Sequence, residues 1–193
     1  MQQAPNQTEA GAAVREFLIL PGYEGSGPAH WQTLWEKEDP AFRRVEQRDW
    51  DHPVRDEWVT ALEKAVAASG ADIVLVAHSL ACLLVAHWAQ SAPAASLGKI
   101  KAAFLVAVAD PAGPSFPAAV VGFEPLPERP LPFPALLVAS ADDPYGPLEF
   151  SRRCARAWGT ALAEIGAKGH INSGSGLGDW PEGKALLRSL LFG

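Results

Sequence analysis

The sequence predicts one α/β domain built around a mostly parallel sheet. Short apolar runs rich in leucine and β-branched residues alternate with longer stretches of helical period, which is the pattern of strands joined by crossover helices. The chain has 193 residues, a length that suits one core. Hydrophobic residues make up 48% and charged residues 20%, which is close to the average of soluble globular domains and excludes a fibrous or largely disordered protein.

Six apolar runs have the length and composition of strands. The second and the last are the weakest, because they are short or partly charged. The predicted strands are residues 16–20, 43–48, 73–77, 102–108, 135–140 and 162–165.

Five segments between and after these strands predict helices, since their apolar residues recur on one helical face. Such helices can lie on both faces of the sheet. Their marker residues are Trp31, Leu34 and Trp35; Trp58, Leu62, Ala65 and Val66; Leu80, Leu83, Leu84 and Trp88; a first turn opening at Pro147; and Leu186, Leu187, Leu190 and Leu191.

Residues 110–134 interrupt this alternation. Eight of the 17 prolines fall there, and proline continues neither a helix nor a central strand. A long irregular insertion in a compact domain is usually a lid or a binding loop, and a passive surface excursion is the alternative.

Charge and cysteine content narrow the possible partners. Lys and Arg total 16 against 22 Asp and Glu, a net charge of −6, and no basic run suits a phosphate backbone, so nucleic acid is not an expected partner. The two cysteines, Cys82 and Cys154, form no disulfide framework and are interpreted as small buried hydrophobic residues. This usage fits the reducing cytoplasm.

The first 15 residues are polar and rich in Ala and Gln, which predicts a disordered leader before a single domain of residues 16–193. No uncharged apolar run reaches the roughly 18 residues of a spanning helix, so no membrane partner is expected. We therefore expect a cytoplasmic protein.

Ser79 stands at the corner between a buried strand and an apolar helix. A sharp turn there lifts a nucleophile above the sheet edge and places it at the positive end of the helix. The residues two before and two after must be small, and here they are Ala77 and Ala81, where the usual elbow has glycines. The alternative is that Ser79 is an ordinary helix N-cap.

A serine nucleophile needs a base, and His170 has the position and chain order for it. His170 follows the last short strand, at the sheet edge that carries the Ser79 turn. His30 and His52 precede the serine, His87 lies two helical turns beyond it, and His78 adjoins it and would point away.

The acid that orients the histidine should follow an intervening strand. Asp143 is preferred, because Pro144 fixes the turn after it; Asp142 and Asp110 are the alternatives, and a pair of solvated turn aspartates is the non-catalytic interpretation. The backbone N–H groups of Leu80 and Tyr23 are the expected oxyanion hole, unless the loop that carries Tyr23 is a plain surface turn.

At this point the sequence resembles a family: the small α/β-hydrolases of the retinoblastoma-binding-protein-9 and YdeN type, especially their bacterial branch of short serine hydrolases. The resemblance extends from Phe17 to the end of the chain. Its blocks are LPGYEGSGPAHWQ at 20–32, DWDHPVRDEW at 49–58, VAHSL at 76–80, ASADDPY at 139–145 and GHINSGSGLGDW at 169–180.

The resemblance implies a reduced α/β-hydrolase fold that lacks the first strands of the full-sized sheet, with a strand order near 2-1-3-4-5-6. It also implies that Ser79 is the nucleophile, Asp143 the acid and His170 the base. Ala81 departs from the glycine that the bacterial branch generally has after Ser-Leu, and we expect its methyl group to be tolerated.

The predicted function is therefore hydrolysis of small carboxylic esters through a Ser-His-Asp triad and an acyl-enzyme. No metal or cofactor is expected, since the chain has no H-E-x-x-H, paired C-x-x-C or G-x-x-x-x-G-K-[ST] motif. The expected partner is a small ester, held in a pocket lined by Tyr23, Trp31, Trp50, Phe116 and Phe123. The alternatives are a protein-binding module on a hydrolase scaffold, and a thioesterase or amidase with the same triad.

Overall fold

The structure is a computed structural model that describes residues 15–70 and 72–193. Its six strands form one parallel sheet in the order β2-β1-β3-β4-β5-β6, which confirms the predicted class and strand order. The strands are β1 (Arg15–Leu20), β2 (Phe42–Arg44), β3 (Asp72–His78), β4 (Ile100–Val106), β5 (Ala135–Ala139) and β6 (Ala161–Glu164).

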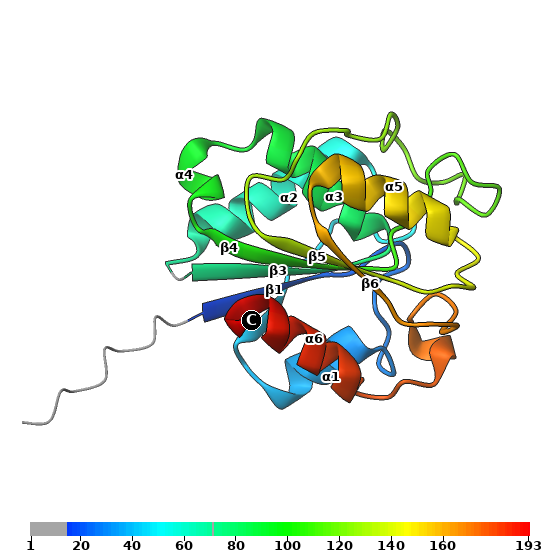
Figure 1. The fold of residues 1–193 in the computed structure, drawn as a ribbon. Helices are drawn as coiled ribbons and strands as arrows, with labels where there is room; N and C mark the ends of the chain where they lie inside the picture. Colours follow the sequence, from blue (N-terminus) through cyan, green and yellow to red (C-terminus); the bar gives the residue numbers. More distant parts are fainter. Residues whose placement is uncertain (1–14, 71) are drawn as a thin grey trace, which may run out of the picture.

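Helices cover both faces of the sheet. In Figure 1, α2, α3, α4 and α5 lie on one face, while α1 and α6 lie on the other. The helices are α1 (Trp31–Glu38), α2 (Arg55–Ala68), α3 (Leu80–Ser91), α4 (Ala94–Leu97), α5 (Leu148–Trp158) and α6 (Pro181–Phe192), with a 3-10 turn η1 (Ser173–Ser175).

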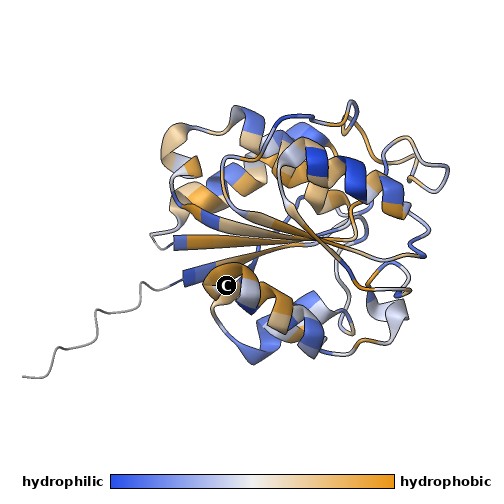
Figure 2. Ribbon diagram, viewed as in Figure 1, coloured by the Kyte–Doolittle hydropathy of each residue, from blue (hydrophilic) through white to orange (hydrophobic). Residues whose placement is uncertain are grey.

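The core has two layers because side chains alternate along each strand. In β3, Ile73 and Leu75 point to the layer shared with α2 and α3, whereas Val74 and Val76 point to the layer shared with α1 and α6. Figure 2 shows the central strands as the most apolar part of the fold, with polar residues on the outer faces of the helices. Both faces of the central strands are therefore buried, as is typical of parallel sheets.

Several predicted boundaries differ from the observed ones, and three of these differences have a local structural cause. The second strand ends at Arg44 rather than at residue 48; the Val45 N–H still donates to the Ile19 carbonyl at 2.9 Å, and the polar residues that follow leave the sheet. The fourth strand ends before Ala107, whose φ of 54° turns the chain away. Pro147 is the N-cap of α5 rather than part of its first turn.

The short helix α4 was not predicted, because four residues give too little periodicity to detect. Of the predicted leader, Arg15 begins β1 and residues 1–14 lie outside the described residues. Within the described ranges, every helix is too short or too polar to cross a lipid bilayer.

The proline-rich segment 110–134 packs closely against the helices. Its β-contact among the described residues is one bridge, Val54 to Val121, and the Leu131 N–H donates to the Trp158 carbonyl at 2.9 Å. Two of its own side chains, Phe123 and Phe133, are buried in the core layer on the α2 and α3 side. The segment therefore runs from the carboxyl end of β4, over the helices, to the amino end of β5.

Candidate active site

Ser79 forms the sharp turn between β3 and α3, with φ 56° and ψ −121°. This backbone conformation costs free energy in a residue other than glycine and persists only where its surroundings hold it. Here the Ser79 N–H donates to the Val106 carbonyl at 2.9 Å, and its own carbonyl accepts from the Cys82 N–H at 3.0 Å. The side chain makes no N-cap hydrogen bond, so the alternative interpretation as a helix cap does not describe it.

The Ser79 side chain instead begins a chain of hydrogen bonds. Its Oγ lies 2.8 Å from Nε2 of His170, and Nδ1 of His170 lies 2.9 Å from both carboxylate oxygens of Asp143. All three residues are buried. Because the carboxylate can only accept, Nδ1 carries the proton and Nε2 is left to accept from the serine hydroxyl.

The two other candidate acids have different roles. Oδ1 of Asp142 accepts from Ser140 Oγ and from the Gly169 N–H, both at 2.8 Å, which ties the loop before His170 to the end of β5. Oδ1 of Asp110 accepts from the Ala112 N–H at 3.0 Å within its own turn. Neither contacts the His170 ring among the described residues.

Two further histidines lie one behind the other next to His170, with their rings tilted or edge-on. The His78 ring centroid lies 4.9 Å from that of His170 and 4.7 Å from that of His30. Nε2 of His78 donates to the backbone carbonyl of His170 at 2.9 Å, which supports the loop that carries the ring. In the sequence, both residues were candidates only for the catalytic base, and their supporting position was not predicted. The adjacency of His78 to Ser79 is the feature that could have indicated it.

Burial keeps these two supporting histidines neutral. It is the main cause that lowers the pKa of His30 to about 3, with the nearby charges of Arg44 and His170 as smaller causes. Burial also lowers the pKa of His78 well below its usual value, helped by His30 and His170. The His78 ring next to His170 and the His30 ring behind it are therefore both neutral in the neutral pH range.

Tyr145 covers the outer side of His170. Its ring centroid is 4.5 Å from the imidazole, it is 38% exposed, and its N–H donates to Asp143 Oδ1 at 2.9 Å. Sequence reasoning missed this residue too, although it closes the block that contains Asp143. The tyrosine screens the buried His170–Asp143 pair from solvent.

The expected oxyanion-hole residues lie beside the serine. Leu80 and Tyr23 both line the pocket above Ser79. Among the hydrogen bonds between described residues, none uses the N–H of either residue. Gly22 lets the two segments approach, since a Cβ there would lie 3.0 Å from the His78 carbonyl oxygen and from Ser79 Cβ. Two unpaired donors next to a nucleophile are suited to a developing negative charge.

The cavity at Ser79 has a volume of about 400 Å³. Tyr23 and Phe116 of the predicted lining residues belong to it, together with Pro117 and Val120 from the proline-rich segment and Tyr145 over His170. The cysteines take no part, because both are buried and free, and burial raises the pKa of each thiol.

Trp31, Trp50 and Phe123 do not line this cavity, which corrects the prediction. Trp31 lies in the core layer on the α1 side and donates from Nε1 to the Ile171 carbonyl at 2.9 Å. Trp50 packs on Trp58 with ring centroids 5.5 Å apart. Phe123 is 1% exposed. These three large aromatic side chains pack against other residues of the protein. Local sequence does not distinguish an aromatic residue that packs from one that contacts a ligand.

Ala81 is fully buried in α3, and the turn and its hydrogen bonds form with alanine there. A parallel sheet of this order, with a serine on the tight turn between a central strand and the next helix, defines an α/β-hydrolase.

Within that class, the chain belongs to the serine hydrolase family, whose model matches residues 17–189. A comparison with curated proteins found no match. Several solved structures are similar. A YdeN-like hydrolase from Pectobacterium atrosepticum is 29% identical with a TM-score of 0.79, over 91% of this chain and 90% of that one.

The ydeN gene product of Bacillus subtilis is 20% identical with a TM-score of 0.73, over 92% of this chain and 98% of the other. Esterase 2 of Thermogutta terrifontis shares the fold at 16% identity and a TM-score of 0.63, over 92% and 82% of the two chains. The family match and the first two structures confirm the predicted resemblance to YdeN-type serine hydrolases.

Proposed function

We propose that the protein hydrolyses small carboxylic esters through an acyl-enzyme on Ser79. The observation that carries this proposal is the unbroken hydrogen-bonded chain from Asp143 through His170 to Ser79 Oγ, at 2.9 and 2.8 Å, ending in a cavity. A serine hydroxyl becomes a useful nucleophile when a base within hydrogen-bond distance removes its proton.

In the acylation step, Ser79 Oγ attacks the ester carbonyl carbon while Nε2 of His170 takes the hydroxyl proton. The negative charge on the carbonyl oxygen is met by the N–H groups of Leu80 and Tyr23. The carbon–oxygen bond to the alcohol then breaks, and His170 donates its proton to the departing oxygen. Asp143 stabilises the imidazolium that exists between these two transfers.

In the deacylation step, water attacks the acyl-enzyme and gives a proton to His170. Collapse releases the carboxylic acid and returns the proton to Ser79 Oγ. The cavity of about 400 Å³ and its apolar side, formed by Phe116, Pro117 and Val120, favour short acyl groups.

A fluorophosphonate probe tests the proposal, since Ser79 Oγ would attack phosphorus and displace fluoride. We expect one adduct per chain, mapped to Ser79 by peptide mass spectrometry, and none in Ser79→Ala. Ser115→Ala is the matched control because Ser115 lines the same cavity, and it should label like the unmodified protein. A folded protein that stays unlabelled, or labels at Ser115, would contradict the proposal and favour the binding-module interpretation.

The leaving group is tested with matched oxyester, thioester and amide substrates that carry the same short acyl group. The proposal predicts the highest kcat/KM for the oxyester. A higher value for the thioester would assign the same site to a thioesterase.

Replacing Gly22 by alanine should slow both probe labelling and ester hydrolysis. The new Cβ would lie 3.0 Å from Ser79 Cβ and 3.3 Å from the Leu80 nitrogen, so the oxyanion donors must separate by a few tenths of an ångström. Small misplacements of this kind cost about tenfold to a hundredfold in rate.

The matched control is Gly27→Ala, because a Cβ at Gly27 meets no atom within 4 Å. Its stopped-flow labelling rate should equal that of the unmodified protein. An unchanged labelling rate in Gly22→Ala would mean that the close contact of Gly22 with Ser79 and Leu80 does not position the oxyanion hole.

A further inference from the structure

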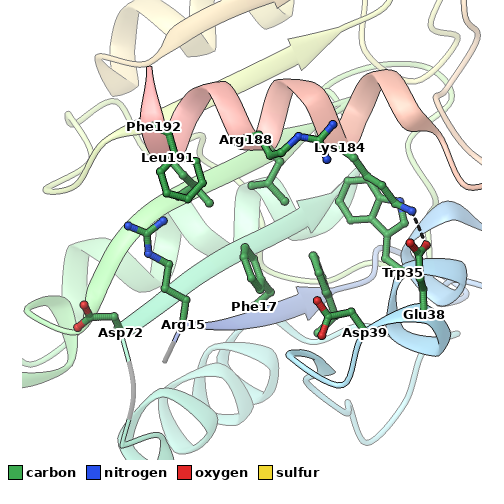
Figure 3. Close-up of a pocket in the computed structure, with 12 residues that line it drawn as sticks. Arg15, Phe17, Trp35, Glu38, Asp39, Asp72, Lys184, Arg188, Leu191 and Phe192 are labelled. Atoms are coloured by element: carbon green, nitrogen blue, oxygen red, sulfur yellow. Dashed lines mark hydrogen bonds and ion pairs between the residues drawn. The ribbon is translucent and has the colours of Figure 1, made fainter. Parts of the chain in front are cut away.

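A second cavity, of about 490 Å³, lies at the opposite end of the sheet from Ser79 (Figure 3). Ser79, Asp143 and His170 follow the carboxyl ends of their strands, whereas Arg15 and Asp72, which line this cavity, begin β1 and β3. It is therefore separate from the candidate active site.

The floor of this cavity is apolar. Along β1, Phe17 points to the same face as Ile19, and its ring stacks on Phe42 of β2 at a centroid distance of 4.3 Å. On this face the described helices are α1 and α6 (Figure 1), and between them Phe17 and Phe42 stay half-buried. The apolar lining residues are Phe17, Trp35, Phe42, Leu187, Leu191 and Phe192.

Most charges on the rim are already paired or bonded. Lys184 pairs with Glu38 and with Asp179, the latter at 3.3 Å. Asp72 faces Lys101 at 3.4 Å. Asp39 accepts from the Ala41 N–H at 2.8 Å.

Among the described residues, two guanidinium groups on the rim, those of Arg15 and Arg188, have no carboxylate partner. Arg15 stacks over the Phe192 ring at 4.9 Å, and its buried Nη1 has no hydrogen-bond partner among the described residues. Arg188 forms no ion pair within the same part of the chain, and Figure 3 shows it on α6, away from Arg15. A buried unpaired guanidinium nitrogen is costly, so it favours an anionic oxygen as its partner.

We propose that this cavity binds a carboxylate with a medium-length alkyl chain. The carboxylate oxygens accept from Arg15, and the chain lies over Phe17 and Phe42 toward Trp35. A single negative charge suits the site, because the rim also carries Glu38, Asp39 and Asp72, which repel a dianion. The volume is within the range of small-molecule pockets.

Isothermal titration of the full chain with decanoate, decanol and decylamine tests the proposal. We expect decanoate to bind with a dissociation constant of about 100 µM or tighter. Decanol should bind about fivefold or more weakly, because it lacks the charge-assisted hydrogen bonds. Equal binding of decanol, stronger binding of decylamine, or no binding of decanoate would overturn the proposal; none of these comparisons depends on a variant folding.

Two variants locate the ligand. Arg15→Gln should weaken decanoate binding about fivefold or more, because the charge-assisted hydrogen bonds are lost. The dissociation constant of decanol should stay unchanged. Arg153→Gln is the matched control, because Arg153 also stacks on a phenylalanine, Phe150 at 5.1 Å, on the other face of the sheet. Unchanged binding by Arg15→Gln would place decanoate elsewhere, the cavity at Ser79 included, and overturn the assignment.

A second copy of the chain is another possible occupant of this cavity. Analytical ultracentrifugation distinguishes it, because it measures the oligomeric state. A concentration-dependent dimer that Arg15→Gln abolishes would assign the cavity to self-association and overturn the proposal. Ser79→Ala should bind decanoate like the unmodified chain. Binding in this cavity is therefore tested independently of the proposed hydrolase activity.

Discussion

Replacing Asp143 by asparagine is expected to lower kcat for ester hydrolysis by about 10⁴-fold, as loss of the triad carboxylate does in other serine hydrolases. The carboxylate accepts from Nδ1 of His170 at 2.9 Å and so leaves Nε2 free to accept the Ser79 proton. An asparagine amide can donate to Nδ1 and move the proton to Nε2. That tautomer cannot take a proton from serine.

The adjacent acid supplies the control. Asp142→Asn keeps an oxygen that can accept from Ser140 and Gly169, so its kcat should fall by less than about tenfold. Steady-state kinetics on a short-chain oxyester compares the two variants, with circular dichroism to verify folding. A similar large loss in both, or a larger loss in Asp142→Asn, would show that the acid was assigned wrongly.

Acidification from pH 7 to pH 5 is expected to lower the free energy of unfolding by about 2 kcal/mol through His30. Burial holds its folded pKa near 3, whereas the unfolded chain has the ordinary value of about 6.5. Between these values only the unfolded state takes up the proton. The stabilisation is therefore complete above pH 6.5 and is lost as the pH falls toward 3; His78, whose pKa is also lowered, adds a loss of the same sign.

His30→Asn isolates this effect. Asparagine is a good N-cap and can replace the contact that His30 Nδ1 makes with the Gln32 N–H, while it removes the titrating group. Urea unfolding at pH 7 and pH 5 should show a pH-dependent loss smaller by about 2 kcal/mol than in the unmodified protein.

Gln90→Asn is the control, because it introduces an asparagine at an exposed position and removes no titrating group. Its pH dependence should match that of the unmodified chain. If the free energy of unfolding of His30→Asn fell between pH 7 and pH 5 by as much as that of the unmodified protein, His30 would not be the neutral buried group responsible for the loss.

Local sequence alone predicts much of this molecule because its signals act over short distances. The β-branched and leucine runs predict the parallel sheet, since strands buried on both faces need apolar residues throughout. Chain order predicts that Ser79, Asp143 and His170 meet, because residues that follow parallel strands collect at one edge. These inferences need the order of the elements and no side-chain coordinates.

Other features depend on which surfaces meet, and only the tertiary structure decides them. Trp31 and Phe123 are core residues, and Trp50 is half-buried against the core; none of them lines the cavity at Ser79. Their aromatic side chains suit packing and ligand binding equally, so residue type does not distinguish the two. His78 reaches the carbonyl of His170 across 92 positions of sequence. No local pattern encodes a contact between such distant residues.

The sequence by itself therefore determined the class of fold, the strand order through its resemblance to a family, and the three residues of the candidate triad. Tertiary packing decided which neighbours hold those residues, namely His78 and Tyr145 with His30 behind His78, and which aromatic rings face the cavity. Within the described part of the chain, it also left Arg15 Nη1 without a hydrogen-bond partner, beside a cavity with an apolar floor. The physical reason is that periodicity and chain order act along the chain, whereas burial and pairing are properties of the assembled surfaces.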